Sequence, residues 1–341
     1  MPTNRFTPVA HHGAAGKVFL TGGAGFIGSH LTDLLLSRGH PVVIVDDLST
    51  GRIENIEFAL QSPFCQFIRQ DAATVDWHDL LGPSDIILHL AASVGVKKVC
   101  ESSLETAQNN HHSLECILEA MRNKGGRHFI YAGTSEVYGD SDAAGSGEND
   151  WLHVHSHLGG RSAYTVSKLY GELLAFAYAE SFDMPVTVVR LFNTIGPRQR
   201  GEYGMVVPVF VQQALAGDPI TVFGDGAQTR SFCDVRDVTE ALYRLAFHPT
   251  NEAGLYNVGN PQEISMLELA EFIRQETGTS SPVQLMPYPP ERSGKTDIRT
   301  RKPDISRIQT AIGWQPRFHW KEAVREIIQQ YARSHAPCFH H

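Results

Sequence analysis

The sequence has few cysteines, no clustered charge of one sign and no long apolar run, and each shortage excludes a class of protein. Its five cysteines are isolated from one another and form neither a disulfide framework nor a metal-binding pattern. No apolar run is long enough to cross a bilayer. The net charge is −8 with scattered basic residues, which argues against a nucleic-acid surface. We therefore expect a soluble cytoplasmic protein with reduced thiols, bound to neither membranes nor nucleic acid.

Residues 1–16 have no apolar core of the kind that a signal peptide needs, and they are predicted to form a loose tail. The remaining length suits one large or two smaller domains, and the hydrophobic share of 42% allows a sizeable core.

Short apolar runs alternate with helical patterns over the first half of the chain. The runs are continuous rather than alternating, which is typical of strands buried on both faces. The predicted strands are Lys17–Thr21, Pro41–Val45, Cys65–Ile68, Ile86–Leu90, His128–Tyr131 and Val186–Leu191, and the helical patterns between them include Phe26–Leu36, Leu104–Asn123 and Tyr164–Phe182. This order predicts an α/β fold with a doubly wound parallel sheet covered on both sides.

The composition and pattern of the sequence change after Pro197, where Gly and Pro become frequent and the predicted strands shorten. We predict a nucleotide-binding domain over residues 17–190 and a smaller C-terminal α/β domain, mainly for substrate, over residues 191–335. The boundary stays open, because Asp234–Phe247 and Gly254–Val258 could return to the sheet.

A glycine-rich turn, TGGAGFIG, lies between the first predicted strand and the first predicted helix. Gly22 would allow the tight turn, Gly25 would let backbone N–H groups approach a pyrophosphate, and Gly28 would let the helix pack closely on the strand. A glycine triplet alone is a weak signal. Its position here is the one that a Rossmann dinucleotide site requires.

Acidic residues follow the second and third predicted strands. Asp46 can accept hydrogen bonds from the adenosine ribose and would repel a 2′-phosphate, which favours NAD over NADP. Asp47 is the neighbouring alternative, and the position favours Asp46. Asp71 could reach the adenine edge or could be a solvated loop carboxylate.

A Tyr-x-x-x-Lys pair, Tyr164 and Lys168, lies on a predicted helix. Tyrosine has a pKa of about 10 in water, too high for a base at neutral pH. A nearby ammonium group favours tyrosinate, and one helical turn brings the lysine to the same side. Thr134 and Ser135 end a strand-like run, where a hydroxyl could bond a sugar hydroxyl or simply form a turn.

Seven segments in order carry a family resemblance: TGGAGFIGSH, HLAA (89–92), TSEVYG (134–139), YTVSK (164–168), RLFNTIGPR (190–198), QTRSF (228–232) and RKPDIS (301–306). Together they resemble an extended short-chain dehydrogenase/reductase and, more narrowly, the nucleotide-sugar epimerase, dehydratase and decarboxylase family. The similarity spans residues 17–335.

The resemblance implies that bound NAD+ takes hydride from C4 of a nucleotide sugar while Tyr164 takes the hydroxyl proton. Lys168 would lower the tyrosine pKa and hold the nicotinamide ribose, and Asn110 would support the lysine from a neighbouring helix. The NAD would stay bound and be regenerated in each cycle. The cofactor contacts expected on this basis are Gly22, Gly25, Phe26, Ile27, Gly28, Asp46, Asp71, Leu90, Ala91, Ala92, Asn110, Tyr164 and Lys168.

The resemblance also places a nucleotide diphosphate, UDP by family habit, against the C-terminal part. Asn193 would bond the diphosphate, and Arg230 and Arg292 would neutralise it, since guanidinium forks suit phosphate oxygens. Phe223 would lie near the base.

Three features bear on the reaction. Glu136 follows Ser135 in a T-S-E run that resembles decarboxylases, and Arg301 matches an arginine that decarboxylases use near the substrate carboxylate. Ser135 stands where a 4,6-dehydratase has an aspartate, which disfavours dehydration. The runs YTVSK and YGMVVP resemble general epimerases. We therefore predict a UDP-sugar 4-epimerase of the UDP-glucose type, with a UDP-glucuronate decarboxylase that makes UDP-xylose as the alternative.

A 4,6- or 5,6-dehydratase ranks below both of these reactions. A non-catalytic NAD-binding scaffold ranks last, because such proteins usually lose the tyrosine or the lysine. The residues expected to act in catalysis are Tyr164, Lys168, Thr134, Ser135 and Glu136.

The alternating histidines His153, His155 and His157 could suggest a metal site. No Cys or patterned carboxylate completes a ligand shell, so we predict no metal and interpret the segment as a loop near the substrate. The family resemblance further implies a homodimer through the helices near 104–123 and 164–182.

Overall fold

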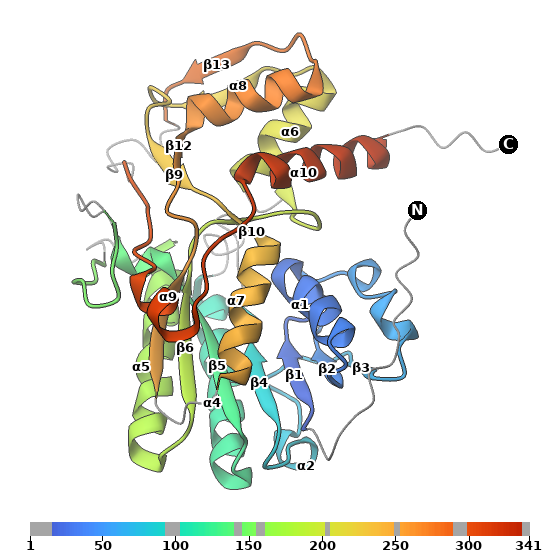
Figure 1. Cartoon of the computed structure of the whole chain (residues 1–341), viewed down its shortest axis with the longest axis vertical. Helices are drawn as coiled ribbons and strands as arrows, with labels where there is room; N and C mark the ends of the chain where they lie inside the picture. The colour runs from blue at the N-terminus through green and yellow to red at the C-terminus, as the bar shows by residue number, and fades with distance from the viewer. Residues whose placement is uncertain are drawn as a thin grey trace, which may run out of the picture.

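A computed structural model of the chain describes residues 16–92, 103–139, 145–154, 161–201, 205–248, 253–288 and 299–335. Figure 1 shows a helix-covered sheet at one end of the molecule and a smaller group of helices and short strands at the other.

Within the described residues, seven parallel strands form the main sheet in the order β11-β6-β5-β4-β1-β2-β3. The strands are β1 (Val18–Thr21), β2 (Val42–Val45), β3 (Cys65–Ile68), β4 (Ile86–His89), β5 (His128–Thr134), β6 (Val186–Leu191) and β11 (Gly254–Val258). The predicted α/β fold with a doubly wound parallel sheet is confirmed. The segment Gly254–Val258 returns to this sheet beside β6.

Helices cover both faces of the sheet because consecutive strand side chains point to opposite sides. Leu20 packs on the side of Leu31 in α1, whereas Phe19 makes an edge contact with Trp77 of α2 on the other side. The first face carries α1 (Phe26–Ser37), α7 (Val235–Phe247) and α9 (Ser306–Ile312), and the second carries α2 (Trp77–Leu80), α4 (Ser103–Lys124) and α5 (Arg161–Phe182). Short 3-10 turns lie at Ile53–Asn55, Ala59–Gln61 and Ser135–Tyr138.

The C-terminal part has its own apolar core around Phe210, Leu269 and Trp320. Its helices are α6 (Val206–Ala216), α8 (Met266–Thr277) and α10 (Trp320–His335), and its paired strands are β8 (Ile220–Phe223) with β13 (Val283–Met286), β9 (Thr229–Ser231) with β12 (Glu263–Ser265), and β7 (Thr194–Ile195) with β10 (Cys233–Asp234). The predicted functional division at residue 190 stays a prediction.

Helices α4 and α5 lie against each other on the second face of the sheet. Helix α5 also exposes much of the side chains of Val166, Tyr170 and Leu173. Such a face suits burial against another surface. The homodimer implied by the resemblance stays a prediction.

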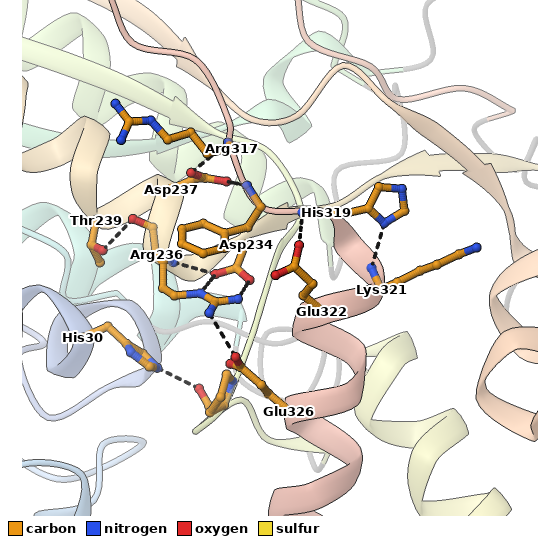
Figure 2. A network of polar contacts seen from close by, with 12 residues as sticks. His30, Asp234, Arg236, Asp237, Thr239, Arg317, His319, Lys321, Glu322 and Glu326 are labelled. Atoms are coloured by element: carbon orange, nitrogen blue, oxygen red, sulfur yellow. Dashed lines mark hydrogen bonds and ion pairs between the residues drawn. The ribbon is translucent and has the colours of Figure 1, made fainter. Parts of the chain in front are cut away.

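Figure 2 shows how the start of α7 is joined to α10 and to the segment before it. The carboxylate of Asp237 accepts hydrogen bonds from the backbone N–H groups of Arg317 and Phe318, each at 3.0 Å. Arg236 donates from Nη1 to Glu326 of α10 at 2.9 Å, and its guanidinium lies over the Phe318 ring. These contacts fix the last helix on the sheet-bearing part of the protein.

We expect Asp237→Ala to lower the free energy of unfolding by about 2–3 kcal/mol, because two N–H groups lose their acceptor at a buried carboxylate. Urea denaturation measures the loss. Asp225→Ala is the matched control: this exposed carboxylate also accepts one backbone N–H, from Ala227, but water can replace it there. Equal losses in the two variants would contradict the importance of the Asp237 contact.

Candidate active site

The strand order of the sheet reverses between β1 and β4: β2 and β3 lie on one side of β1, and the later strands lie on the other. Ligands of open parallel sheets bind at the carboxyl ends of the strands at such a switch point. The glycine turn follows β1, and the predicted cofactor segment of Leu90, Ala91 and Ala92 follows β4. Both therefore flank the crevice predicted to hold a dinucleotide.

The glycine turn has the geometry that its sequence predicts. Gly22 has φ of 71°, a left-handed conformation that favours glycine, and its N–H donates to the Val45 carbonyl at 2.9 Å. A Cβ at Gly22 would lie 2.8 Å from the nitrogen of Ala91. A Cβ at Gly28 would lie 2.1 Å from the Gly22 carbonyl oxygen, so helix and turn can meet this closely only with glycine there.

Helix α1 begins directly behind this turn. Gly25 is its N-cap residue, and Phe26 and Ile27 form its first turn. The first N–H groups of a helix have no acceptor within the helix and are oriented for an anionic group. The turn and the closely packed helix N-terminus thus fit the pyrophosphate of NAD.

Asp46 lies at the end of β2 against the same turn. It is buried, and its carboxylate accepts N–H groups from Ala24 at 2.9 Å and Leu48 at 2.9 Å. Burial raises the pKa of Asp46, and these two backbone bonds oppose the rise. Asp47 is exposed and accepts the N–H of Ser49 in a local turn. Of the two candidates, Asp46 is the one in contact with the glycine turn.

No sequence signal indicated two residues that contact Asp46 or the glycine turn. A Cβ at Gly51 would lie 2.8 Å from Oδ1 of Asp46, and Asn55 donates to the Ala24 carbonyl at 2.9 Å. Both look like ordinary turn residues in the sequence. Asp71 lies after β3, where its Oδ1 accepts the N–H of Ala73.

A buried threonine–histidine pair joins the ends of β1 and β4. Thr21 Oγ1 lies 2.7 Å from Nδ1 of His89 and accepts the N–H of Ala91 at 3.2 Å. Complete burial lowers the pKa of His89 to about 3, and the charge of Lys168 adds to this effect. The neutral imidazole therefore serves to hold the two strand ends together, a role that no sequence signal indicated.

Lys168 extends from α5 toward β5 and is buried. Its Nζ donates to the Ala132 carbonyl at 2.7 Å and lies 4.8 Å from the centre of the Tyr131 ring. Burial lowers the pKa of Lys168 to about 8, and Glu172 acts in the opposite direction. A lysine with this pKa remains mostly cationic at neutral pH, as the predicted role requires.

Tyr164 lies one turn earlier in the same helix and is half-buried. Asn110 of α4 donates from Nδ2 to Ser167 Oγ at 3.2 Å, and that hydroxyl donates to the Tyr164 carbonyl at 2.9 Å. Asn110 thus contacts α5 at the residue before Lys168. These bonds fix the turn of helix that carries the predicted tyrosine–lysine pair.

The predicted T-S-E residues begin where β5 ends. Thr134 and Ser135 are buried, and Thr134 Oγ1 accepts the N–H of Glu136 at 3.3 Å. The nearest oxygen of Glu136 lies 4.0 Å from Nη1 of Arg301, and both side chains are largely buried. The structure therefore brings together two predicted residues that are far apart in the sequence.

Arg301 is held in place through its backbone. Ser231 donates from Oγ to the Arg301 carbonyl at 3.1 Å. The N–H of Ser146 donates to the Lys302 carbonyl at 2.8 Å, and Ser146 forms a parallel bridge with Pro303. The segment that carries Arg301 thus lies between β9 and the loop that follows β5.

The other predicted substrate residues lie in the C-terminal part or next to it. Asn193 donates from Nδ2 to the Ser231 carbonyl at 3.3 Å, beside Arg230 in β9. Phe223 ends β8 and stacks on Tyr288 with ring centres 6.0 Å apart. Arg292 lies outside the described residues.

His153 is exposed, and its N–H donates to the Val137 carbonyl. His155 and His157 lie outside the described residues. No group of three or more His, Cys, Asp or Glu in the described part of the chain could hold a metal ion. In the same part of the chain, no helix is both long and apolar enough to span a membrane.

The model of the NAD dependent epimerase/dehydratase family matches residues 18–259. The chain is 37% identical to the UDP-N-acetyl-alpha-D-glucosaminuronate decarboxylase of Bacillus cytotoxicus, over 92% of this chain and 97% of that protein. It is 35% identical to UDP-glucuronic acid decarboxylase 1 of Arabidopsis thaliana, over 92% of this chain and 69% of that protein.

Solved structures with the same fold include a UDP-N-acetylglucosamine 4-epimerase from Methanobrevibacter ruminantium (TM-score 0.85, 28% identity, 94% of this chain and 99% of that one). Another is the UDP-glucuronic acid 4-epimerase from Bacillus cereus in complex with UDP-glucuronic acid and NAD (TM-score 0.84, 29% identity, 94% and 100%). The chain therefore belongs to the NAD dependent epimerase/dehydratase family, and the prediction of an extended short-chain dehydrogenase/reductase of the nucleotide-sugar epimerase and decarboxylase group, with NAD as cofactor, is confirmed.

Proposed function

We propose that this protein is a UDP-hexuronate decarboxylase that oxidises the sugar transiently at C4 and releases C6 as CO2. The observation that carries the proposal is the pair of Arg301 and Glu136, buried beside the end of β5. A guanidinium fork matches a carboxylate, which a uronate has at C6 and a neutral hexose lacks. The distance of 4.0 Å between Arg301 Nη1 and Glu136 Oε1 is longer than a direct hydrogen bond.

The relatives support this choice over the 4-epimerase predicted from the sequence. Proteins named as decarboxylases of UDP-N-acetylglucosaminuronate and UDP-glucuronate are 37% and 35% identical to the chain over 92% of its length. The solved 4-epimerases are similar at 28% and 29% identity. One of them was solved with UDP-glucuronic acid, so epimerisation of the same uronate is the competing reaction.

In this proposal the glycine turn and Asp46 would hold NAD+, which would supply the hydride acceptor for C4 and afterwards the hydride donor. Tyr164 takes the proton of the C4 hydroxyl, and the ammonium of Lys168 stabilises the tyrosinate. Thr134 or Ser135 bonds the same hydroxyl and so orients C4. The resulting 4-keto uronate is a β-keto acid.

When the C5–C6 bond of this acid breaks, its electron pair moves toward the C4 oxygen and CO2 leaves. Arg301 orients the departing carboxylate, and Glu136 positions the guanidinium. C5 then takes up a proton from solvent, and the C4 alcohol is restored when C4 regains a hydride and Tyr164 returns the proton that it took. Because C4 loses one hydride and regains one, the cycle needs no external oxidant or reductant.

We further propose that residues 17–190, with the returns near 230–258, bind NAD and that residues 191–335 mainly bind the nucleotide sugar. Asn193 bonds the carbonyl of Ser231, the residue after Arg230 in β9, and the diphosphate would lie there. Phe223 and its stacked neighbour Tyr288 would lie near the base. Arg292, the other predicted diphosphate ligand, lies outside the described residues.

The proposal is tested by incubating the enzyme and NAD+ separately with UDP-glucuronate, UDP-N-acetylglucosaminuronate and UDP-glucose. We expect CO2 and a UDP-pentose from at least one of the two uronates and no conversion of UDP-glucose, because only a uronate places a carboxylate beside Arg301. Trapped CO2 and chromatography of the nucleotide sugars give the result. UDP-galactose from UDP-glucose, or UDP-galacturonate without CO2, would contradict decarboxylation in favour of a 4-epimerase.

Arg301→Lys tests the carboxylate contact, because lysine keeps the charge but loses the planar fork. We expect kcat/KM for the uronate to fall about 100-fold, while the affinity for NAD stays unchanged. Arg307→Lys is the matched control, since Arg307 lies in α9, shortly after Arg301, and its partly exposed guanidinium donates to the exposed Asn149. Unchanged decarboxylation by the Arg301→Lys variant would remove the main support for the proposal.

A further inference from the structure

A buried carboxylate lies one helical turn beyond the tyrosine–lysine pair. Glu172 of α5 is 2% exposed, and Arg190 of β6 donates three hydrogen bonds to it at 2.8–3.2 Å. Tyr164, Lys168 and Glu172 are spaced four apart in the helix, so their side chains share one face. That face packs on β5.

The two charged side chains lie against adjacent residues of that strand. The ammonium of Lys168 donates to the carbonyl of Ala132. A Cβ at Gly133 would lie 2.6 Å from Oε1 of Glu172. The carboxylate therefore occupies the space that any other residue at Gly133 would fill, and it lies on the same stretch of β5 as the ammonium.

Among the described residues around Lys168, Glu172 is the anionic group that offsets the positive charge of the ammonium. The ring of Tyr131 on β5 faces the ammonium at 4.8 Å, and the imidazole of His89 on β4 is neutral. Arg190, the cation behind Glu172, is itself bonded to that carboxylate. Burial lowers the pKa of Lys168, and Glu172 raises it.

We propose that Glu172, held by Arg190, is a positioning residue that keeps Lys168 cationic and so lets Tyr164 serve as the base. It contacts the sugar through neither oxygen and acts only through the lysine. The inference rests on the proposed roles of Tyr164 and Lys168, which 4-epimerisation and decarboxylation share. It does not depend on which uronate is bound.

The sign of the effect follows from the charges. Without its carboxylate, Lys168 has a pKa further below about 8, so neutral lysine forms at a lower pH. A neutral lysine no longer favours tyrosinate, which raises the pKa of Tyr164. In Glu172→Gln we therefore expect the alkaline limb of the kcat profile to move about one pH unit toward acid, and the ionisation of Tyr164 to move toward alkali.

The experiment uses the full chain loaded with NAD+ and no sugar. The ionisation of Tyr164 is followed by the ultraviolet difference spectrum of tyrosinate, with Tyr164→Phe subtracted in each background. The kcat profile against pH, with the substrate that turns over, is the second measurement. A role in folding alone would change the amount of active enzyme but neither of these midpoints.

Tyr138→Phe is the matched control. The hydroxyl of Tyr138 accepts from Arg190 Nη1 at 3.0 Å and donates to Asn257 at 2.7 Å, so its removal damages the same buried network without changing a charge. We expect lower thermal stability and unchanged midpoints in this control. A shift equal to that of Glu172→Gln would overturn the inference.

Glu172→Gln leaves the Arg190 guanidinium buried without its carboxylate, which can prevent folding. The double variant Glu172→Met with Arg190→Met removes both charges and replaces the pair by apolar side chains, and we expect the same direction of shift. Wild-type midpoints in a folded variant would overturn the role of Glu172. Absence of any Tyr164 signal in the wild type would overturn the roles of the pair, and the inference with them.

Discussion

The site depends on one buried ammonium group, that of Lys168, pressed against the carbonyl of Ala132. Removal from water costs a charged group several kcal/mol unless nearby dipoles and charges replace the lost hydration. Here a carbonyl, an aromatic face and the carboxylate of Glu172 do so. The competition leaves the pKa of Lys168 at about 8, so the lysine is mostly cationic at neutral pH but within reach of small changes around it.

The contact between Lys168 and Ala132 also fixes the position of the elements around it. Helix α5 cannot slide along β5 without removing the ammonium from its carbonyl, and β5 itself is paired on both sides by β4 and β6. The same strand ends in Thr134, so the predicted hydroxyl ligands are fixed by the element that fixes the lysine. Arg301 reaches this point from the far end of the chain, through a backbone segment bonded to Ser146 and Ser231.

The sequence predicted the parts of this arrangement that local chemistry determines. Continuous apolar runs identified the strands, because both of their faces are buried. The glycine turn was predictable because Gly22 and Gly28 leave no room for a side chain. Contacts between residues far apart in the sequence were not predictable in this way. Glu172 resembles a solvated helix residue in the sequence, and only its meeting with Arg190 across the core, in the space at Gly133, distinguishes it.

The same distinction explains why the tyrosine motif favoured a 4-epimerase, whereas the proposed decarboxylase rests on Arg301 and Glu136. Between Tyr164 and Lys168, Val166 is exposed and Ser167 bonds Asn110 of α4. Ser167 therefore reports on how α4 packs on α5, and Val166 reports on the exposed surface of α5. The fate of a 4-keto uronate is decided at C5 and C6, so the informative side chains are those beside the carboxylate. Arg301 and Glu136 occupy that place in the proposed site, and neither belongs to the tyrosine motif.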